Sequence, residues 1–450
     1  MTPQPAAPVA LAQQGNSALS FCIICHSERS EESMNDLYQL YLKCGSVCTD
    51  TRSLKPGQMF FALKGENFDG NAFVGKALEA GAACVVASIP YADDRVVTVP
   101  DTLEALQALA AEHRRALGIP VVGLTGTNGK TTTKELIKAV LGSKFRICAT
   151  EGNLNNDIGV PLSVLKFTKD TEIGIIEMGA SHPEDLRPLL KVSQPSCGLI
   201  TNVGKAHLLG FGSFEGVKHA KGLLYDWLAQ NGGTVFANVS DPVLAGMLKD
   251  RGIEPVGYSM DSVQILPASP ENPCLRFVVD GVTVKTRLVG AYNAANCLAA
   301  ITVGKHFGVS LADAVKAIEA YLPSNNRSQL EKTARNTLIV DASNANPSSM
   351  AVALDNLALC EGPKAALLGD MRELGADSQS EHARIAATLG RFDKVYLVGD
   401  EFTKVAGSQY QCFAKSEDLA EYLKANPLEG YTVLVKGSRG IKMENVLPAL

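Results

Sequence analysis

The sequence predicts an α/β protein of three domains. A central, doubly wound and mostly parallel sheet with a P-loop is expected between a small α/β amino-terminal domain and a Rossmann-like carboxyl-terminal domain. The chain has 450 residues, too many for one ordinary hydrophobic core. Short apolar runs alternate with segments of helical period along most of its length. A glycine-rich turn at residues 126–129 separates a buried apolar run from a helical segment.

The domain boundaries follow from composition and from chain-breaking residues. We expect a disordered extension at 1–33, a first domain at 34–115, a central domain at 116–325 and a last domain at 326–450. The first 33 residues are rich in Ala, Pro, Gln, Ser and Glu and show no regular period, whereas Met34 opens the first patterned segment. The sequence leaves open whether translation starts at Met1 or at Met34.

Periodicity predicts the elements inside each domain. In the first domain we expect strands at 58–63 and 83–87 and helices at 72–80 and 103–117. In the central domain we expect strands at 121–124, 173–177, 197–202 and 234–238 and helices at 132–141 and 293–307. In the last domain we expect strands at 338–341, 364–369, 394–398 and 432–435, separated by helices.

Composition excludes several classes of partner. The formal net charge is -5 and the charges are interleaved, so no basic surface for nucleic acid is expected. No run approaches the roughly 18 apolar residues needed to cross a bilayer, so we expect no membrane insertion. Eleven cysteines without regular pairing indicate reduced thiols and a cytoplasmic protein, which we expect to be a monomer. A zinc knuckle at Cys22, Cys25 and His26 is the alternative for the first segment, although it lacks a fourth ligand.

The glycine-rich turn reads Gly126-Thr127-Asn128-Gly129-Lys130-Thr131 and is followed by Thr132. Glycines let backbone N–H groups turn toward an anion, Lys130 offers a charge to phosphates, and the Thr131 hydroxyl suits magnesium. The turn is shorter than the common P-loop pattern, because Leu124 stands where the first glycine would be. An ordinary strand-to-helix turn is the alternative interpretation.

Two further side chains follow predicted strands of the same sheet. Glu177 closes the strand at 173–177 and could supply a hard oxygen ligand to magnesium. His207 follows the strand at 197–202 and could face the same crevice. The alternatives are a solvated acidic residue and a structural histidine.

Seven segments occur in an order that is specific in combination: GTNGKTTTK at 126–134, GNLNNDIGVP at 152–161, EMGA at 177–180, NVGKAH at 202–207, DASNANPSSM at 341–350, LGDMRELG at 368–375 and KGSRG at 436–440. Together they resemble the Mur ligases of peptidoglycan synthesis, and the resemblance runs from Met34 to the carboxyl terminus. It implies an ATP-dependent amide ligase that joins D-alanyl-D-alanine to UDP-N-acetylmuramoyl-tripeptide through an acyl phosphate. The sequence does not indicate whether the third residue of the tripeptide is diaminopimelate or lysine.

The resemblance assigns the UDP part of the substrate to the first domain. The matching positions are Thr49, Asp50, Thr51, Arg52, Leu63, Gly65, Asp69 and Gly70. A guanidinium and backbone amides both donate to anionic oxygens, which suits a diphosphate. Asn71 stands where the family usually has histidine, so that contact is in question.

The resemblance also implies the catalytic and metal-binding residues. Lys130 and Thr131 would bind ATP and Mg²⁺, and Glu177 and His207 would ligate the metal. Lys221 would be carbamylated by carbon dioxide, which turns an ammonium into an anionic oxygen ligand. Leu223 replaces the glutamate that usually follows this lysine, and a plain surface lysine is the alternative.

Further positions match the family around the nucleotide and the peptide. The nucleotide set comprises Asn238, Asn293, Asn296, Arg327 and Asp341. The substrate set comprises Asn155, Asn156, Asn344 and Asn346. Tyr292 replaces a usual histidine and Ser343 a usual tyrosine, which puts the packing of the nucleotide in question.

Other functions remain open at this point. Another Mur-type ligase or a ligase like folylpolyglutamate synthase shares this style of loop. A P-loop switch or motor would need a macromolecular partner. A scaffold without catalytic activity is the third alternative, because of Leu223 and Ser343.

Overall fold

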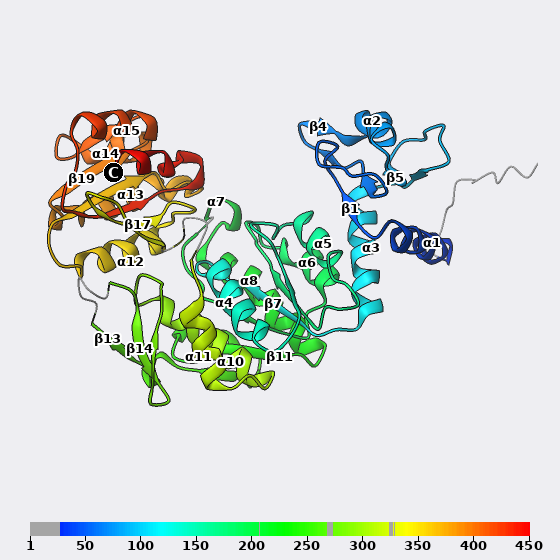
Figure 1. The fold of residues 1–450 in the computed structure, drawn as a ribbon, viewed down its shortest axis with the longest axis horizontal. Helices are drawn as coiled ribbons and strands as arrows, with labels where there is room; N and C mark the ends of the chain where they lie inside the picture. The colour runs from blue at the N-terminus through cyan, green and yellow to red at the C-terminus, as the bar shows by residue number, and fades with distance from the viewer. Residues whose placement is uncertain (1–27, 207, 268–272, 324–326, 328) are drawn as a thin grey trace, which may run out of the picture.

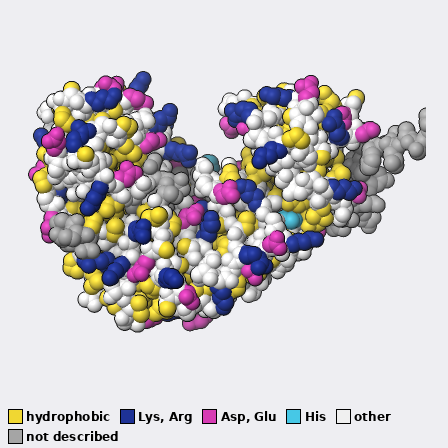
Figure 2. All heavy atoms as spheres, in the orientation of Figure 1, with side chains coloured by type: hydrophobic (Ala, Val, Ile, Leu, Met, Phe, Trp, Pro, Cys, Tyr) yellow, Lys and Arg dark blue, Asp and Glu magenta, His cyan; other side chains and the backbone are white. Residues whose placement is uncertain are grey.

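The computed structural model describes residues 28–206, 208–267, 273–323, 327 and 329–450. Three lobes follow one another along the chain (Figure 1). The first and last lobes stand at opposite ends of the central one, and the space-filling view shows an open hollow between them (Figure 2). The alternative zinc knuckle at Cys22, Cys25 and His26 and the predicted metal ligand His207 both lie outside the described residues.

The first lobe contains a parallel sheet of order β1-β2-β5-β6. Its strands are β1 (Val47–Cys48), β2 (Met59–Phe61), β5 (Cys84–Ala87) and β6 (Val96–Thr98). The helices are α1 (Glu28–Cys44), α2 (Val74–Glu79) and α3 (Thr102–Leu117), and β3 (Lys64–Gly65) pairs with β4 (Phe68–Asp69) beside the short helix η1 (Gly70–Phe73). The predicted strands near 60 and 85 and the helix at 103–117 are confirmed.

The start of the first lobe differs from expectation. A disordered extension was expected at 1–33, but helix α1 begins at Glu28, so residues 28–33 are helical. Glu and Arg in this segment are good helix formers and continue the helix toward the amino terminus without an apolar period of their own. The apolar period, by contrast, marks only the part that packs, including the buried Leu37 and Tyr41.

The central lobe is built on a six-stranded sheet of order β12-β11-β10-β7-β9-β8, parallel throughout. The strands are β7 (Val121–Thr125), β8 (Ile147–Ala149), β9 (Ile173–Glu177), β10 (Cys197–Ile200), β11 (Thr234–Asn238) and β12 (Val256–Tyr258). Strands β7, β9 and β10 are buried along their whole length, as expected for a parallel sheet covered on both faces. The doubly wound central domain is therefore confirmed.

Helices cover both faces of this sheet. One core cluster joins side chains of the sheet to α4 (Lys130–Gly142), α10 (Asn293–His306) and α11 (Leu311–Ala320). The other joins the sheet to α5 (Gly159–Val164), α6 (Leu186–Ser193), α8 (Phe214–Gln230) and α9 (Pro242–Lys249). The short helix α7 (Leu208–Phe211) precedes α8, and η2 (Met260–Ser262) follows β12.

A small antiparallel sheet was not predicted. It consists of β13 (Gln264–Leu266), β14 (Arg276–Val279) and β15 (Val282–Lys285). Strands of three or four residues are too short to show a reliable alternating pattern. Buried Phe277 and Val284 attach this sheet to the cluster that contains α4 and α10.

The last lobe has a six-stranded sheet of order β16-β17-β21-β18-β19-β20, in which only β16 is antiparallel. The strands are β16 (Gln329–Lys332), β17 (Thr337–Asp341), β18 (Lys364–Gly369), β19 (Lys394–Val398), β20 (Gln411–Phe413) and β21 (Thr432–Lys436). The helices are α12 (Pro347–Ala358), α13 (Ser378–Ala386), α14 (Asp400–Ala406) and α15 (Ser416–Ala425), with short helices η3 (Gly375–Asp377), η4 (Leu389–Arg391), η5 (Arg439–Ile441) and η6 (Met443–Ala449). The four predicted strands of this Rossmann-like domain are confirmed, whereas the edge strands β16 and β20 were missed.

Within the described ranges, no helix is long and apolar enough to cross a membrane. The nine cysteines that the structure describes are all free thiols.

Candidate active site

The turn between β7 and α4 requires glycine at two positions. Gly126 has φ +146°, and a Cβ there would stand 2.0 Å from Oγ1 of Thr201. Gly129 has φ +78°, and a Cβ there would stand 2.8 Å from Oδ1 of Asn296. Both the backbone conformation and the close neighbours therefore exclude larger residues. Helix α4 starts at the next residue, so its free N–H groups face the turn.

The carboxyl end of β10 holds the P-loop in place. Backbone N–H groups of Thr127 and Asn128 donate to the backbone oxygen and to Oδ1 of Asn202, at 2.9 and 3.0 Å. Oγ1 of Thr201 donates to the carbonyl of Asn128 at 2.6 Å. Strand β10 ends at Ile200, two residues earlier than predicted, which leaves Thr201 and Asn202 available for the loop. Their role was not predicted, although their place directly after a buried strand was the available signal.

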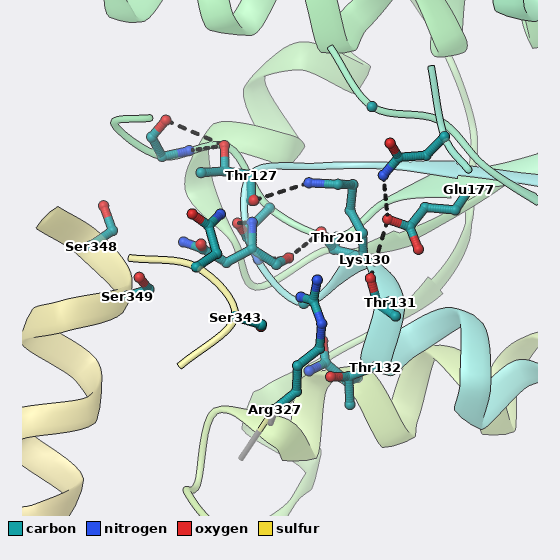
Figure 3. Close-up of a pocket in the computed structure, with 18 of the residues that line it drawn as sticks. Thr127, Lys130, Thr131, Thr132, Glu177, Thr201, Arg327, Ser343, Ser348 and Ser349 are labelled. Carbon is teal, nitrogen blue, oxygen red and sulfur yellow. Dashed lines mark hydrogen bonds between the residues drawn. The ribbon is translucent and has the colours of Figure 1, made fainter. Parts of the chain in front are cut away.

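Lys130 folds back over the loop that precedes it (Figure 3). Its Nζ donates to the carbonyl oxygens of Gly126 at 2.9 Å and Thr127 at 3.2 Å. Burial lowers the pKa of Lys130, while the Glu177 carboxylate opposes this shift and Arg327 adds to it. The ammonium therefore lies at the mouth of the loop, close to where a phosphate would be cradled.

Glu177 points toward the first turn of α4 (Figure 3). Its Oε1 accepts hydrogen bonds from Thr131 Oγ1 at 3.2 Å and from Asn155 Nδ2 at 2.9 Å. The residue is 1% exposed, and its Oε2 is buried without a hydrogen-bond partner. A buried carboxylate oxygen without a donor is costly, so this atom suits a ligand that carries positive charge.

Lys221 is buried at 2% exposure in the middle of α8. Its Nζ donates to the carbonyl of Ala180 at 3.4 Å and lies 5.5 Å from the centre of the Phe211 ring. Burial lowers the pKa of Lys221 to about 7; Lys130 adds to this shift and Asp185 opposes it. The alternative of a plain surface lysine is wrong, because the side chain is enclosed. Leu223 packs into the hydrophobic core on the same helix and contributes no polar atom.

Three of the predicted nucleotide side chains lie on α10 and at the end of β11. Asn293 donates to the carbonyl of Val289 at 2.7 Å and accepts from Nδ2 of Asn296 at 2.9 Å. Oδ1 of Asn296 accepts from Oγ1 of Thr133 at 3.0 Å, which ties α10 to the P-loop helix. Asn238 accepts from Oγ of Ser240 at 2.7 Å. Asn238, Asn293 and Asn296 all line one cavity, which is bordered by α4, α10 and the end of β11.

The last domain forms the opposite wall. Lys436, 1% exposed, donates from Nζ to Oδ2 of Asp341 at 2.5 Å and to the carbonyl of Asn344 at 3.0 Å. Asn346 is buried and donates from Nδ2 to Oδ1 of Asn128 at 2.7 Å. Lys436 belongs to the KGSRG segment, and its pairing with Asp341 could not be predicted because it depends on the strand order of the sheet.

A single cavity of about 1170 Å³ unites most of the predicted residues. The predicted residues that line it are Thr127, Asn128, Gly129, Lys130, Thr131, Thr132, Asn155, Asn156, Glu177, Asn238, Asn293, Asn296, Arg327, Asp341 and Asn344. Ser181, Asp185, Thr201, Asn202, Lys436 and Arg439 also line it and were not predicted. Gly126, Lys221 and Asn346, which were expected at the nucleotide, the metal and the peptide respectively, are not among its lining residues.

The predicted UDP-binding residues are not part of this cavity. Thr49, Asp50, Thr51, Arg52, Leu63, Gly65, Asp69 and Gly70 all lie in the first lobe. Arg52 is 84% exposed at its side chain and pairs with Asp50 at 2.6 Å, which lowers the pKa of that carboxyl to about 2. Asn71 stands where the family usually has histidine. Its side chain donates to Asp69 and Ser88 and accepts from the Ser88 N–H, so it is engaged in hydrogen bonds within the first lobe.

A glycine-rich loop at the head of a helix, a buried carboxylate beside it and a Rossmann-like domain across the cavity define a P-loop α/β enzyme that acts on a nucleotide. Residues 44–114, 124–304 and 326–439 match the families described as "Mur ligase family, catalytic domain", "Mur ligase middle domain" and "Mur ligase, glutamate ligase domain". The chain belongs to the Mur ligase family, whose members are ATP-dependent ligases.

Relatives and solved structures agree with this assignment over most of the chain. Two curated relatives named UDP-N-acetylmuramoyl-tripeptide--D-alanyl-D-alanine ligase, from Bacillus subtilis and Escherichia coli, are each 36% identical over 423 residues. Each alignment covers 90% of this chain, with 92% and 93% of the respective relative. The crystal structure of MurF ligase from Thermotoga maritima in complex with ADP superposes with a TM-score of 0.81 at 27% identity, over 90% of this chain and 96% of that one.

Proposed function

We propose that this chain is an ATP-dependent amide ligase that joins D-alanyl-D-alanine to UDP-N-acetylmuramoyl-tripeptide in the synthesis of peptidoglycan precursors. The observation that carries the proposal is the 36% identity to two ligases of that name over 90% of the chain, with the P-loop and Glu177 in one cavity. ADP and inorganic phosphate are the other products. A ligase like folylpolyglutamate synthase is disfavoured, because these relatives match the first domain as well as the other two.

The first chemical step activates a carboxylate, which is otherwise a poor electrophile. An oxygen of the terminal carboxylate of the tripeptide attacks the γ-phosphorus of ATP. The bond from this phosphorus to the β–γ bridging oxygen breaks, ADP leaves, and an acyl phosphate remains. Lys130 and the N–H groups at the start of α4 face the charge that develops on the transferring phosphoryl group.

The second step forms the amide. The neutral amine of the dipeptide attacks the acyl carbon and forms a tetrahedral intermediate. The carbon–oxygen bond to phosphate then breaks, inorganic phosphate leaves, and the amine loses its proton to solvent or a base. The acyl phosphate has to be shielded from water, and the wall that the last domain forms on the cavity would both shield it and bring the two substrates into line.

The residues around Glu177 fit a Mg²⁺ ion. The unpartnered Oε2 of Glu177 and the hydroxyl of Thr131 are hard oxygen donors within one small region. When bound there, Mg²⁺ would neutralise charge on the phosphates. We assign Thr131 and Glu177 to this site, and His207 as a third ligand on the resemblance alone.

Lys221 fits carbamylation. The ammonium first loses a proton; the neutral amine then adds to carbon dioxide, a C–N bond forms and a second proton is released, so that a cation becomes an anion. A pKa of about 7 leaves a substantial neutral fraction near neutrality. The carbamate oxygens would then join Glu177 as anionic ligands to the metal.

The remaining assignments complete the proposal. Asn238, Asn293, Asn296, Arg327 and Asp341 surround the nucleotide, and Asn155, Asn156 and Asn344 face the peptide. The UDP moiety binds at Thr49–Arg52, Leu63, Gly65, Asp69 and Gly70, where Arg52 would exchange Asp50 for the diphosphate. We further propose that the protein works as a monomer in the cytoplasm, which sedimentation and cell fractionation would test.

A phosphate-release assay tests the proposal directly. The enzyme is incubated with ATP, Mg²⁺ and UDP-N-acetylmuramoyl-tripeptide, and D-alanyl-D-alanine is added last. Sustained phosphate release that requires both substrates, with formation of the pentapeptide by mass spectrometry, supports ligation. Equal release with glutamate as acceptor favours the folylpolyglutamate-like alternative. Release that depends on neither substrate contradicts the proposed reaction.

A further inference from the structure

Among the residues that the structure describes, a side-chain hydrogen bond connects the last domain to the P-loop. Nδ2 of Asn346 donates to Oδ1 of Asn128 at 2.7 Å, between residues that are 218 positions apart in sequence. Asn346 is 4% exposed and stands immediately before α12. A buried and well-formed contact of this kind fixes the direction in which one domain faces the other.

The amide of Asn346 performs two separate tasks. Its Oδ1 accepts from the N–H of Ser349 at 2.9 Å and caps α12, while Oγ of Ser349 accepts from the N–H of Asn346 at 3.1 Å. Ser, Asp or Asn could each supply the capping oxygen equally well. Aspartate has no donor when ionised, and serine has a single oxygen for both contacts, so of the three only asparagine has separate acceptor and donor atoms for the helix and for Asn128. The contact with Asn128, and not the cap, therefore accounts for the choice of asparagine.

The other end of the hydrogen bond is equally specific. The backbone of Asn128 is held within its own domain, with its N–H on Asn202 and its carbonyl on both Thr201 and Asn202. The side chain of Asn128 is thus not needed to shape the loop toward β10. It is the part of the loop that the last domain contacts.

Neighbouring contacts place this hydrogen bond within a continuous seam. Oγ of Ser348 would lie 3.2 Å from a Cβ at Gly204, so α12 packs closely on the segment after β10. The same seam includes the Lys205–Glu381 ion pair at 3.4 Å and the hydrogen bond from the Leu209 N–H to the Glu373 carbonyl at 3.5 Å. The ion pair and the long backbone bond are adjustable, whereas the 2.7 Å amide contact has one geometry.

We propose that Asn346 is a positioning residue that aligns the last domain with the P-loop, and that it does so through Asn128 without contacting substrate. Asp341, Asn344 and Lys436 line the cavity from the same domain and would lose their alignment with Lys130 if α12 shifted. A reaction that joins two substrates slows markedly when the aligned groups are displaced even slightly. The activity readout rests on the proposed ligase function, whereas the exchange readout below does not.

The test compares four variants of the full-length enzyme, which are Asn346→Ser, Asn346→Ala, Asn128→Ala and the double variant Asn128→Ala/Asn346→Ser. Asn346→Ser keeps the cap of α12 but is too short to reach Asn128, whereas Asn346→Ala loses both contacts. We expect Asn346→Ser to lower kcat by about threefold to tenfold, with the KM values for ATP, UDP-substrate and dipeptide within about twofold of the parent. In an Asn128→Ala background, Asn346→Ser should cause no further loss, since the coupled partner is already gone.

Hydrogen–deuterium exchange supplies a readout that does not need turnover. Without the contact, backbone amides at 126–130 and 201–211 should exchange faster in Asn346→Ser than in the parent. Asp101→Ser is the matched control, because Asp101 caps α3 through the N–H groups of Leu103 and Glu104, away from the cavity. This control should change neither kcat nor exchange at those segments.

The outcomes separate the alternatives. A lower unfolding temperature with unchanged kcat and exchange would reduce Asn346 to a helix cap and overturn the proposal. A raised KM for either substrate at constant kcat would make it a substrate contact and overturn it as well. Faster exchange in Asn346→Ser, with no ligation by any form of the enzyme, would support the positioning role while refuting the proposed function.

Discussion

Lys436 and Asp341 are direct neighbours across the parallel pair β17 and β21, and the ammonium lies 2.5 Å from the carboxylate. Lys436 is 1% exposed, while the side chain of Asp341 is 18% exposed and faces the cavity. Nζ of Lys436 also donates to the carbonyl of Asn344. The pair therefore keeps the Asp341 carboxylate in place, with its charge compensated by Lys436, beside the cavity that we propose receives the nucleotide.

Replacing Lys436 with methionine should damage both stability and nucleotide binding. Removing one member of a buried pair leaves an uncompensated charge, which lowers the free energy of unfolding by about 3–5 kcal/mol. The unpaired Asp341 should also repel triphosphate and raise the KM for ATP. Urea denaturation and initial-rate kinetics measure the two effects. Adding Asp341→Asn should recover part of the stability, and a stability that stays at the parent level would contradict the structural role of the pair.

Replacing Lys130 with alanine should abolish most of the ligation. Its ammonium lies on the carbonyls of Gly126 and Thr127, where in the proposed reaction it would act on the phosphoryl charge that grows in the transition state. We expect kcat to fall by about a hundredfold or more. Lys138→Ala, on the exposed face of the same helix, is the control and should retain parental kcat. Peptide joining at full speed by Lys130→Ala would refute the phosphate-binding role of the loop.

The sequence was sufficient to predict the P-loop and the strand end at Glu177, because both depend on local order. The signals for the loop are a buried strand, two glycines and a helical period, and all of them lie within one stretch of about twenty residues. The carboxyl ends of parallel strands meet at one edge of a sheet, so a carboxylate at residue 177 could be placed near the loop before the structure was known.

Other parts of the site depend on contacts that periodicity does not encode. Lys436 meets Asp341 only because the last strand of the chain, β21, inserts between β17 and β18. Asn346 meets Asn128 only because two domains come together. Thr201 and Asn202 looked like the end of a strand, and their role follows from the position of the loop beside them. The strands β13 to β15 were missed because each has only three or four residues.

Replacing Glu177 with glutamine should shift the dependence on magnesium. Glutamine keeps an oxygen for Thr131 and Asn155 but lacks the negative charge that the unpartnered Oε2 offers to a dication. The Mg²⁺ concentration for half-maximal activity should rise by about tenfold or more, with a lower kcat at saturation. Titrations of ligation against Mg²⁺ measure this shift. Glu254→Gln, at an exposed surface position, should leave the titration unchanged, and an identical curve for Glu177→Gln would remove Glu177 from the metal site.

Carbamylation of Lys221 predicts a dependence on pH and on carbon dioxide. Burial lowers the pKa of Lys221 to about 7, so its neutral fraction rises as the pH increases through that value. Because the neutral amine is the form that adds to carbon dioxide, activity should rise across about pH 6–8, and bicarbonate should restore part of the activity at the acidic end. The folded protein binds fewer protons at this site than the unfolded chain between about pH 7 and 10.5, so the stability contribution of this lysine also increases with pH there.

With ¹³C-labelled bicarbonate, a carbamate resonance should appear in the parent and be absent in Lys221→Met. Addition of a short-chain carboxylic acid should rescue the activity of Lys221→Ala in part, and a parent enzyme that shows neither the resonance nor any response to bicarbonate would rule the modification out.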